Sequence, residues 1–382
     1  MTTLPDFRLE THFSRWEFNA RHHMTASDSQ TISMRELLAL ADDEDRAAWE
    51  NIALGYTETY GAPALRAAIA ATYEGLSAAD ILCFAGAEEG LYCAMLALLG
   101  PEDHAIVTVP NYQSMETLPV TIAGAVTGVP LRPENNWRLD IADVRAALKP
   151  NTRLICVNFP NNPTGAIANQ ETFRALASLC AERGIHLFSD EVYRGLERDP
   201  SLCLPQAAEL FERGISLNVM SKAYGLPGLR IGWIACRDHA LLERMEKMKH
   251  YLSICNSRPS EVLATIALKA RETILDRNRA LVATNLDKLS AFFAEYPDLY
   301  EWRAPDGGCV GFARYRGADG VETHCRRLVE ESGVLLLPSS LFVSDLLPVV
   351  TDRFRVGFGR KDIEIGLDAW RRHLLDEHRA PA

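Results

Sequence analysis

Short apolar runs alternate with helical periods through the middle of the chain, and this alternation restricts the fold more than any other feature. Five runs predict strands: Ile81–Phe84, His104–Val109, Arg153–Phe159, Ile185–Ser189 and Ser216–Met220. Between them, segments such as Glu89–Leu99 and Thr172–Arg183 have the apolar spacing of amphipathic helices. Strand–helix alternation of this kind is typical of a parallel sheet with helices on both faces. We therefore predict an α/β fold that binds ligands beyond the carboxyl ends of its strands.

The chain is also long enough for two domains, because its 382 residues exceed the usual size of one domain. From about Arg271 the pattern changes to long helical periods, of which Asn278–Tyr296 is the clearest. Two further strands are predicted near Cys309–Tyr315 and Arg353–Phe358. We predict a large α/β domain over residues 46–275 and a smaller α+β domain formed by residues 1–45 and 276–382.

Composition and charge exclude several classes of protein. The formal net charge is −11 with both signs interspersed, which argues against nucleic acid or an anionic membrane as the main partner. No apolar run approaches the ~20 residues that cross a bilayer, and the N-terminus lacks the apolar block of a signal peptide. The nine cysteines are scattered and form no Cys-x-x-Cys pair. We expect a cytoplasmic protein with reduced, buried thiols.

The segment Ser221–Gly232 carries a lysine, three glycines and an arginine. Lys222 is placed to form a Schiff base, provided that burial or nearby positive charge lowers its pKa. Arg230 presents a planar donor fork that suits a phosphate. The same stretch is also compatible with a plain turn that enters a strand over Leu229–Ala235.

Asp190, Tyr193 and Asn162 stand just after predicted strands. A carboxylate buried at Asp190 needs a cation or strong donors, and a protonated pyridine nitrogen is such a partner. The alternative for Asp190 is a helix N-cap. Tyr193 and Asn162 could donate to a phenolic oxygen of the same ring. In isolation, Tyr193 would fit a core or a surface position, and Asn162 the turn composition Asn-Pro-Thr-Gly.

Three further features have two interpretations each. The run Gly86–Gly90 opens a helix whose free N–H groups would bind a phosphate, while its glutamates fit ordinary first-turn acids. Arg355 suits a substrate α-carboxylate, or an internal salt bridge to an acid such as Asp352. His22 and His23 would fit a metal site or a substrate contact. Because no third ligand stands at a useful spacing, a surface pair is favoured and no metal site is predicted.

Together these residues offer what pyridoxal phosphate needs: an amine, a phosphate clamp, a carboxylate for the ring nitrogen and donors for the ring oxygen. Their order along the chain resembles that of the class I and II aminotransferases, which are fold-type I pyridoxal-phosphate enzymes. The resemblance implies a mostly parallel seven-stranded sheet between helices, plus a smaller α+β domain. It implies that Lys222 forms the internal aldimine and shuttles the proton at Cα. Asp190 would pair with the ring nitrogen, and Tyr193 and Asn162 would bind the ring oxygen.

The resemblance also assigns the phosphate contacts. Arg230 would hold the phosphate together with the N–H groups of Ala87 and Glu88. Many members of the family carry a serine or threonine three residues before the lysine, where this chain has Val219. The neighbouring hydroxyl of Ser221 is the candidate replacement.

The remaining assignments concern the ring, the substrate and a second subunit. Tyr112 matches the aromatic residue that stacks on the cofactor ring. Arg355 matches the anchor of the substrate α-carboxylate, with Asn162 beside it. Tyr56 matches the tyrosine that reaches the phosphate of the other subunit. The resemblance therefore implies a homodimer with shared active sites.

Two departures from the family pattern affect the expected reaction. The segment His22–Ser29 replaces the Gly-x-Pro turn with which many members line the substrate pocket. The segment Tyr251–Ser260 resembles a subgroup that includes capreomycidine synthase, in which the same cofactor serves a cyclisation.

We expect an aminotransferase that acts on an L-α-amino acid and a 2-oxo acid. The alternative is an elimination, replacement or cyclising enzyme, because all of these reactions share a carbanion at Cα and the residues that form it. A regulator with an aminotransferase-like domain is disfavoured, since no basic helix-turn-helix extension accompanies the acidic chain. The sequence does not specify the substrate side chain.

Overall fold

The computed structural model describes residues 4–377, and its largest element is a seven-stranded sheet with the strand order β2-β8-β7-β6-β5-β3-β4. Its strands are β2 (Ile81–Phe84), β3 (His104–Val109), β4 (Ala125–Pro130), β5 (Thr152–Asn158), β6 (His186–Asp190), β7 (Gly214–Val219) and β8 (Gly232–Cys236). β8 runs antiparallel to both of its neighbours, and all other neighbouring pairs are parallel. The predicted mostly parallel sheet is therefore confirmed, and the sequence prediction missed only the edge strand β4.

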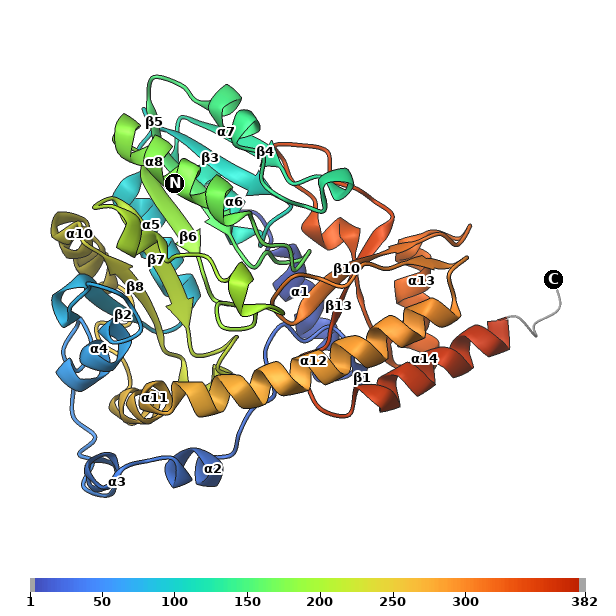
Figure 1. Ribbon diagram of the computed structural model, residues 1–382, viewed down its shortest axis with the longest axis horizontal. Coiled ribbons are helices and arrows are strands. Elements are labelled where there is room, and N and C mark those ends of the chain that lie inside the picture. Colours follow the sequence, from blue (N-terminus) through green and yellow to red (C-terminus); the bar gives the residue numbers. More distant parts are fainter. Residues whose placement is uncertain (1–3, 378–382) are drawn as a thin grey trace.

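Helices cover both faces of this sheet, as predicted (Figure 1). One face carries α5 (Ala87–Leu98), α6 (Ser114–Ile122) and α10 (His239–Lys249), and the other carries α7 (Ile141–Ala147), α8 (Gln170–Arg183) and α9 (Ala207–Leu210). Because side chains alternate along a strand, Ile106 and Ile155 pack on the α8 side while Val107 and Cys156 pack on the α5 side. Burial on both faces explains why these strands read as continuous apolar runs.

The C-terminal part contains a four-stranded antiparallel sheet with the order β12-β13-β10-β9. Its elements are β9 (Tyr300–Glu301), β10 (Val310–Tyr315), α13 (Val321–Arg327), β12 (Leu337–Pro338), β13 (Arg353–Gly357) and α14 (Ile363–Glu377). The long helix α12 (Arg271–Glu295) runs from the side of the large sheet to this smaller sheet, with α14 next to it (Figure 1). Aromatic side chains such as Phe292, Tyr300 and Trp370 fill the core between them.

The N-terminal segment contacts both parts of the molecule. Its elements are α1 (Arg8–Trp16), β1 (His22–His23), α2 (Met34–Ala39), α3 (Asp43–Glu50) and α4 (Pro63–Ala70). β1 pairs in parallel with β11 (Val334–Leu335), whereas α2, α3 and α4 pack on α11 (Arg258–Lys269). The predicted boundaries at residues 45 and 275 fall inside α3 and α12, and the division into two domains stays a prediction. Residues 1–3 and 378–382 of the predicted small domain lie outside the described residues.

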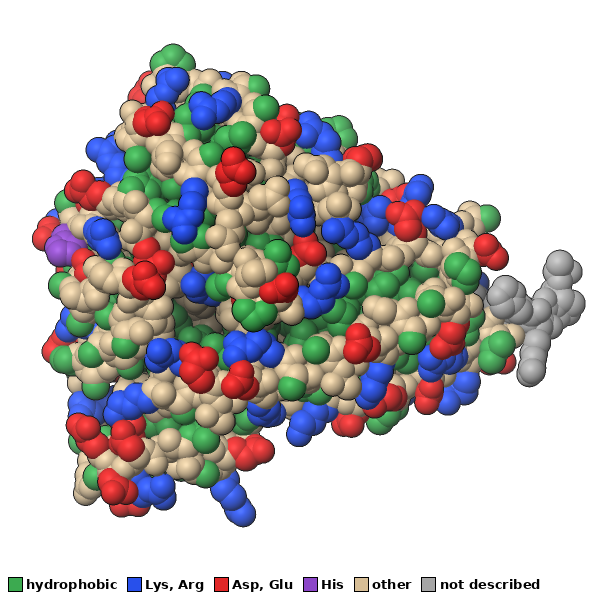
Figure 2. Space-filling model, in the orientation of Figure 1, with side chains coloured by type: hydrophobic (Ala, Val, Ile, Leu, Met, Phe, Trp, Pro, Cys, Tyr) green, Lys and Arg blue, Asp and Glu red, His purple; other side chains and the backbone are tan. Residues whose placement is uncertain are grey.

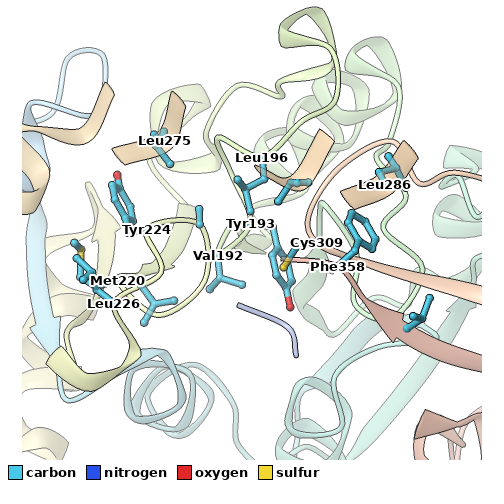
Figure 3. Packing of buried hydrophobic residues seen from close by; sticks show 14 of the residues in the cluster. Val192, Tyr193, Leu196, Met220, Tyr224, Leu226, Leu275, Leu286, Cys309 and Phe358 are labelled. Atoms are coloured by element: carbon cyan, nitrogen blue, oxygen red, sulfur yellow. The ribbon is translucent and has the colours of Figure 1, made fainter. Parts of the chain in front are cut away.

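One apolar cluster joins the two parts beneath the ends of β6 and β7. Figure 3 shows Val192 and Tyr193, from the turn after β6, near Cys309, which precedes β10. Met220 from the turn after β7 and Leu275 from α12 belong to the same cluster. This packing fixes the carboxyl ends of the central strands relative to the smaller sheet.

The surface and the thiols agree with the composition. Acidic and basic side chains are mixed over the face shown in Figure 2. Within residues 4–377, no helix combines the length and the apolar character needed to cross a membrane. All nine cysteines are unpaired and seven of them are buried, which confirms the prediction of free thiols.

Candidate active site

A cavity of about 710 Å³ lies at the carboxyl ends of the central strands. Asn158, Asp190 and Val219, the last residues of β5, β6 and β7, line it. Nine of the eleven predicted site residues line this one cavity: Ala87, Glu88, Tyr112, Asn162, Asp190, Tyr193, Ser221, Lys222 and Arg230. The other two, Tyr56 and Arg355, lie outside its wall. The cavity is therefore where the strand-end motifs meet.

Lys222 lies in the turn that follows β7, and its amine reaches the cavity. Its Nζ donates a hydrogen bond of 2.9 Å to the hydroxyl oxygen of Ser27. Burial lowers the pKa of Lys222, and the nearby carboxylate of Asp28 opposes this shift. A lowered pKa increases the fraction of neutral amine, which is the form that attacks a carbonyl or accepts a proton.

Asp190 ends β6 and is only 8% exposed. Its Oδ1 accepts a hydrogen bond of 3.1 Å from the N–H of Val192, within a turn, so the alternative of a helix N-cap is wrong. Burial raises the pKa of Asp190 to about 6, and the charge of Lys222 opposes this only in part. A carboxylate that has lost its hydration in this way is stabilised by a cation, and a protonated ring nitrogen fits that requirement.

Asn162 and Arg355 are connected although 193 positions separate them. Nη1 of Arg355 donates to Oδ1 of Asn162 at 2.9 Å, and Nη2 donates to the carbonyl of Thr25 at 2.9 Å. The first bond leaves Nδ2 of Asn162 as a donor at the cavity wall. Asp352, the alternative partner of Arg355, instead accepts from Nε of Arg314 at 2.6 Å, so that alternative is wrong. Arg355 is fully buried behind Asn162, with no carboxylate partner within residues 4–377.

The amino end of α5 approaches Arg230. Gly86 precedes this helix with φ = 99°, and a Cβ at this position would lie 2.3 Å from Nη2 of Arg230. Only glycine therefore allows this backbone and this approach. No side chain caps the first N–H groups of α5, at Ala87 and Glu88. These N–H groups, the Arg230 guanidinium and the Ser221 hydroxyl form a set of donors that suits a phosphate.

The Glu88 carboxyl group differs from the ordinary first-turn acid that the sequence suggested. It accepts a hydrogen bond of 3.0 Å from the hydroxyl of Ser114 and lies in the cavity wall. Burial raises the pKa of Glu88 to about 7. A protonated Glu88 adds a donor beside the amino end of α5, whereas an ionised one would repel an anion there.

The three tyrosines predicted for the site have different surroundings. Tyr112 packs against Phe7 with 5.1 Å between ring centroids, and its hydroxyl donates to Oε1 of Glu10 at 2.8 Å. Tyr193 is buried with Ser27 beside its hydroxyl, and burial raises its pKa. Tyr56 is 88% exposed and lines a separate surface hollow with Arg258. Tyr56 therefore contributes nothing to the cavity of its own chain.

Sequence reasoning missed the residues that the N-terminal segment brings to the cavity. Four charged or hydroxyl-bearing residues of this segment line the cavity in addition to those predicted: Glu10, Glu17, Ser27 and Asp28. Asp28 forms an ion pair with Arg360, whose Nη2 lies 2.9 Å from Oδ1. Arg360 also lines the cavity and follows Arg355 by five residues, so its position beside that motif was the one available signal.

The preference for a surface pair at His22 and His23 is wrong for His23. Its ring stacks on Phe13 with 5.9 Å between centroids, and both ring nitrogens are closed to solvent. Burial lowers the pKa of His23 to about 4, so the ring is neutral near pH 7. His23 lines the cavity, and residues 4–377 contain no cluster of three or more His, Cys, Asp or Glu side chains that could hold a metal.

Comparisons with known proteins agree with this geometry. The family model described as Aminotransferase class I and II matches residues 27–368. Capreomycidine synthase from Streptomyces vinaceus is 31% identical over 371 residues, which cover 96% of this chain and 93% of that protein. An arginine–pyruvate transaminase from Pseudomonas aeruginosa is 30% identical over 294 residues, 75% of this chain and 74% of that protein. A crystal structure of a PLP-dependent aminotransferase from Streptococcus suis superposes with a TM-score of 0.90 at 29% identity, covering 98% of each chain.

Proposed function

Because the chain belongs to the class I and II aminotransferase family, we propose that it is a pyridoxal-phosphate-dependent aminotransferase in which Lys222 binds the cofactor. Its substrates are an L-α-amino acid and a 2-oxo acid. The observation that supports this most is the convergence of the Lys222 amine, the Asp190 carboxylate and the uncapped amino end of α5 on one cavity.

The residues present fit the cofactor. When bound, pyridoxal phosphate supplies an aldehyde that captures an amine and a ring that stabilises negative charge at Cα. Asp190 forms no ion pair within residues 4–377, and its raised pKa favours a cationic partner such as a protonated ring nitrogen. Arg230 and the first N–H groups of α5 suit the phosphate. The ring of Tyr112, held by Phe7 and Glu10, offers a flat surface for stacking.

Lys222 moves the proton at Cα in this proposal. Its lowered pKa increases the fraction of neutral amine, and a neutral amine can take a proton from Cα and return one. Asn162 and Arg355 orient the amino acid. Arg355 stands behind Asn162, and its Nε has no acceptor within residues 4–377, so the guanidinium has spare donor capacity for a carboxylate.

The charges that remain in the cavity favour a substrate with a positively charged side chain. Arg360 is already paired with Asp28. Glu10 and Glu17 lie seven positions apart at α1 and line the cavity, and the carboxylate of Glu17 has no ion pair or hydrogen bond within residues 4–377. Burial and the charge of Glu10 raise the pKa of Glu17. A guanidinium or ammonium group between the two carboxylates would relieve this repulsion, and one relative is named for a reaction of arginine.

A second candidate is a lyase or cyclase that uses the same Cα chemistry. The similarity to capreomycidine synthase, which extends over 96% of the chain, favours it. The residues around Cα serve both reactions equally, so the fate of the negative charge at Cα separates them.

We also propose a homodimer in which Tyr56 reaches the phosphate site of the other subunit. Tyr56 at 88% and Leu54 at 83% exposure line the surface hollow that contains Arg258, and Tyr251, two positions before Ser253 of the same hollow, is 91% exposed. So much exposed apolar area in one place suits contact with a second copy. Light scattering of the purified protein should give about twice the monomer mass.

The experiment that tests the function uses holoenzyme, one amino acid at a time and no 2-oxo acid. We expect L-arginine to yield its 2-oxo acid in an amount equal to the enzyme sites and no more, because the amino group then has no acceptor. With a β-hydroxylated arginine, which carries a leaving group at Cβ, continued formation of a product that has lost one water, open or cyclised, would support the second candidate. L-Citrulline, which has nearly the same shape without the charge, should react roughly tenfold or more slowly. Absence of any reaction across a panel of amino acids would contradict the proposal.

A further inference from the structure

The segment Met24–Gln30 passes between the Lys222 turn and the end of β13 at unusually close range. Gly225 has φ = 67°, and a Cβ there would lie 2.7 Å from the carbonyl oxygen of Gln30. A Cβ at Gly359 would lie 2.3 Å from the carbonyl oxygen of Asp28. The segment can therefore take this course only because both positions are glycine. The backbone bond from Gln30 N–H to Gly359 O, at 2.8 Å, fixes the segment in place.

Three cations of the site contact this one segment. Arg355 donates to the carbonyl of Thr25 at 2.9 Å, and Arg360 pairs with Asp28. Lys222 donates from Nζ to Oγ of Ser27 at 2.9 Å. Of these contacts, only the one with Ser27 joins a side-chain hydroxyl to the amine that the proposed reaction uses.

We infer that Ser27 is a positioning residue for Lys222, holding the free amine at the cavity wall whenever the lysine is not bound to the cofactor. This inference rests on the proposed function of Lys222. A neutral amine has two N–H groups and one lone pair. When one N–H is bound to Ser27, fewer orientations of the lone pair remain, and the long side chain loses less freedom as the proton at Cα is transferred.

The hydrogen bond also affects the charge on Lys222. An acceptor favours the ammonium form over the amine, so loss of the Ser27 hydroxyl should lower the pKa of Lys222 further. The titratable and charged groups that act on Lys222 besides this bond are Asp28, Arg355, Cys309 and Glu10. Asp190 and Glu17 interact with Lys222 as well. Substitution of Ser27 leaves all of these groups in place.

The test compares Ser27→Ala with Ser27→Thr and with Ser29→Ala. Thr keeps the hydroxyl, and Ser29 is a matched control because its buried hydroxyl has no partner within residues 4–377. We expect kcat of Ser27→Ala to fall roughly tenfold to a hundredfold while KM changes less than about threefold. The Thr variant should recover most of kcat, and Ser29→Ala should match the wild type.

A second readout does not depend on turnover. In apoprotein, the pH dependence of Lys222 acetylation, followed by peptide mass spectrometry, reports the pKa of the amine. We expect a lower midpoint in Ser27→Ala only. Equal kcat values and equal midpoints in Ser27→Ala and Ser29→Ala would overturn the inference. If no amino acid reacts with the wild-type holoenzyme, the proposed function fails, and the acetylation midpoints still decide whether Ser27 controls Lys222.

Discussion

Burial lowers the pKa of two lysines, Lys222 after β7 and Lys249 at the end of α10, but their polar surroundings differ. Nζ of Lys249 donates three hydrogen bonds of between 2.5 and 2.8 Å, to Thr59 O, Cys83 O and Asn256 Oδ1. Nζ of Lys222 donates one, to Ser27, and otherwise faces the cavity. An ammonium group has three protons, so Lys249 is fully satisfied whereas Lys222 has donor capacity left. The comparison indicates that incomplete bonding, more than burial, distinguishes a reactive lysine from a structural one.

The largest effect should come from Lys222→Ala. Without this amine the protein loses both its link to the cofactor and its proton carrier, so turnover should fall by more than about a thousandfold. Borohydride reduction of wild-type holoenzyme should fix the cofactor mass on the peptide that contains Lys222. The exposed Lys247, on the same helix as Lys249, provides the control substitution Lys247→Ala. Normal turnover by Lys222→Ala would remove Lys222 from the reaction.

The opposite outcome is expected for Lys249→Met. This change removes the donor from two buried acceptors and one partly buried acceptor, and it should lower the free energy of unfolding by about 3–5 kcal/mol. The bonds of Lys249 tie the segment near Thr59 to the loop that contains Asn256, so the surface around Tyr56 should loosen as well. Urea denaturation measures the change, with Lys247→Met as the control. A loss below about 1 kcal/mol would mean that the three bonds are not what stabilises this region.

The sequence identified the strand ends and their motifs because both are local. The runs Ile81–Phe84 and His104–Val109 match β2 and β3, since strands buried on both faces must be continuously apolar. β4 (Ala125–Pro130) was missed because this half-buried edge strand contains Gly128 and ends in a proline. Polar residues that follow parallel strands meet at one edge, which is why Asp190 and Lys222 could be assigned to one site.

The contacts between residues on opposite sides of the cavity could not be predicted from the sequence in the same way. Ser27 lies 195 positions from Lys222, and the segment that carries it has no helical or strand period. The arrangement of Arg355 behind Asn162 depends on how the smaller sheet packs on the larger one. Motif residues therefore indicated the chemistry, whereas the tertiary packing determined which side chains hold them in place.

The adjacent acids Asp190 and Glu191 differ in the same way as the two lysines, because one carboxylate has more hydrogen-bond partners than the other. The carboxylate of Glu191 accepts hydrogen bonds of 2.9 Å from Ala207 N–H and the Ser216 hydroxyl, whereas within residues 4–377 the carboxylate of Asp190 accepts only from Val192 N–H. Burial raises the pKa of Asp190 from 3.8 to about 6. Between these values the folded apoprotein binds more protons than the unfolded chain, so its free energy of unfolding falls as the pH rises.

Asp190→Asn should remove this part of the pH dependence. The difference in unfolding free energy between wild-type and variant apoprotein should change by about 2.5 kcal/mol between pH 4 and pH 7. Glu191, whose pKa burial raises to about 7, titrates in both proteins and cancels in this difference. Glu88 cancels for the most part, because burial is the main cause of its pKa of about 7 and the charge of Asp190 only the smallest one. Urea titrations at several pH values measure it. Parallel plots of unfolding free energy against pH for the two proteins would show that other groups of the apoprotein already stabilise the Asp190 carboxylate, as hydrogen bonds stabilise Lys249.

The smallest effect should come from Val219, which lines the cavity at the end of β7 and offers no donor where related enzymes carry a hydroxyl. Val219→Thr replaces one methyl group by a hydroxyl with little change in shape. One added neutral hydrogen bond to the phosphate is worth about 1 kcal/mol, so apoprotein should bind pyridoxal phosphate roughly fivefold more tightly. A fluorescence titration measures the affinity, and Val219→Ala controls for the lost methyl group.

If Val219→Thr binds no more tightly, Ser221 already satisfies the phosphate at this position, and Ser221→Ala should then weaken binding by the same factor. In that case every donor of the phosphate site would already have an acceptor, as Lys249 does. Unused donor capacity in the cavity would then be found only near Lys222.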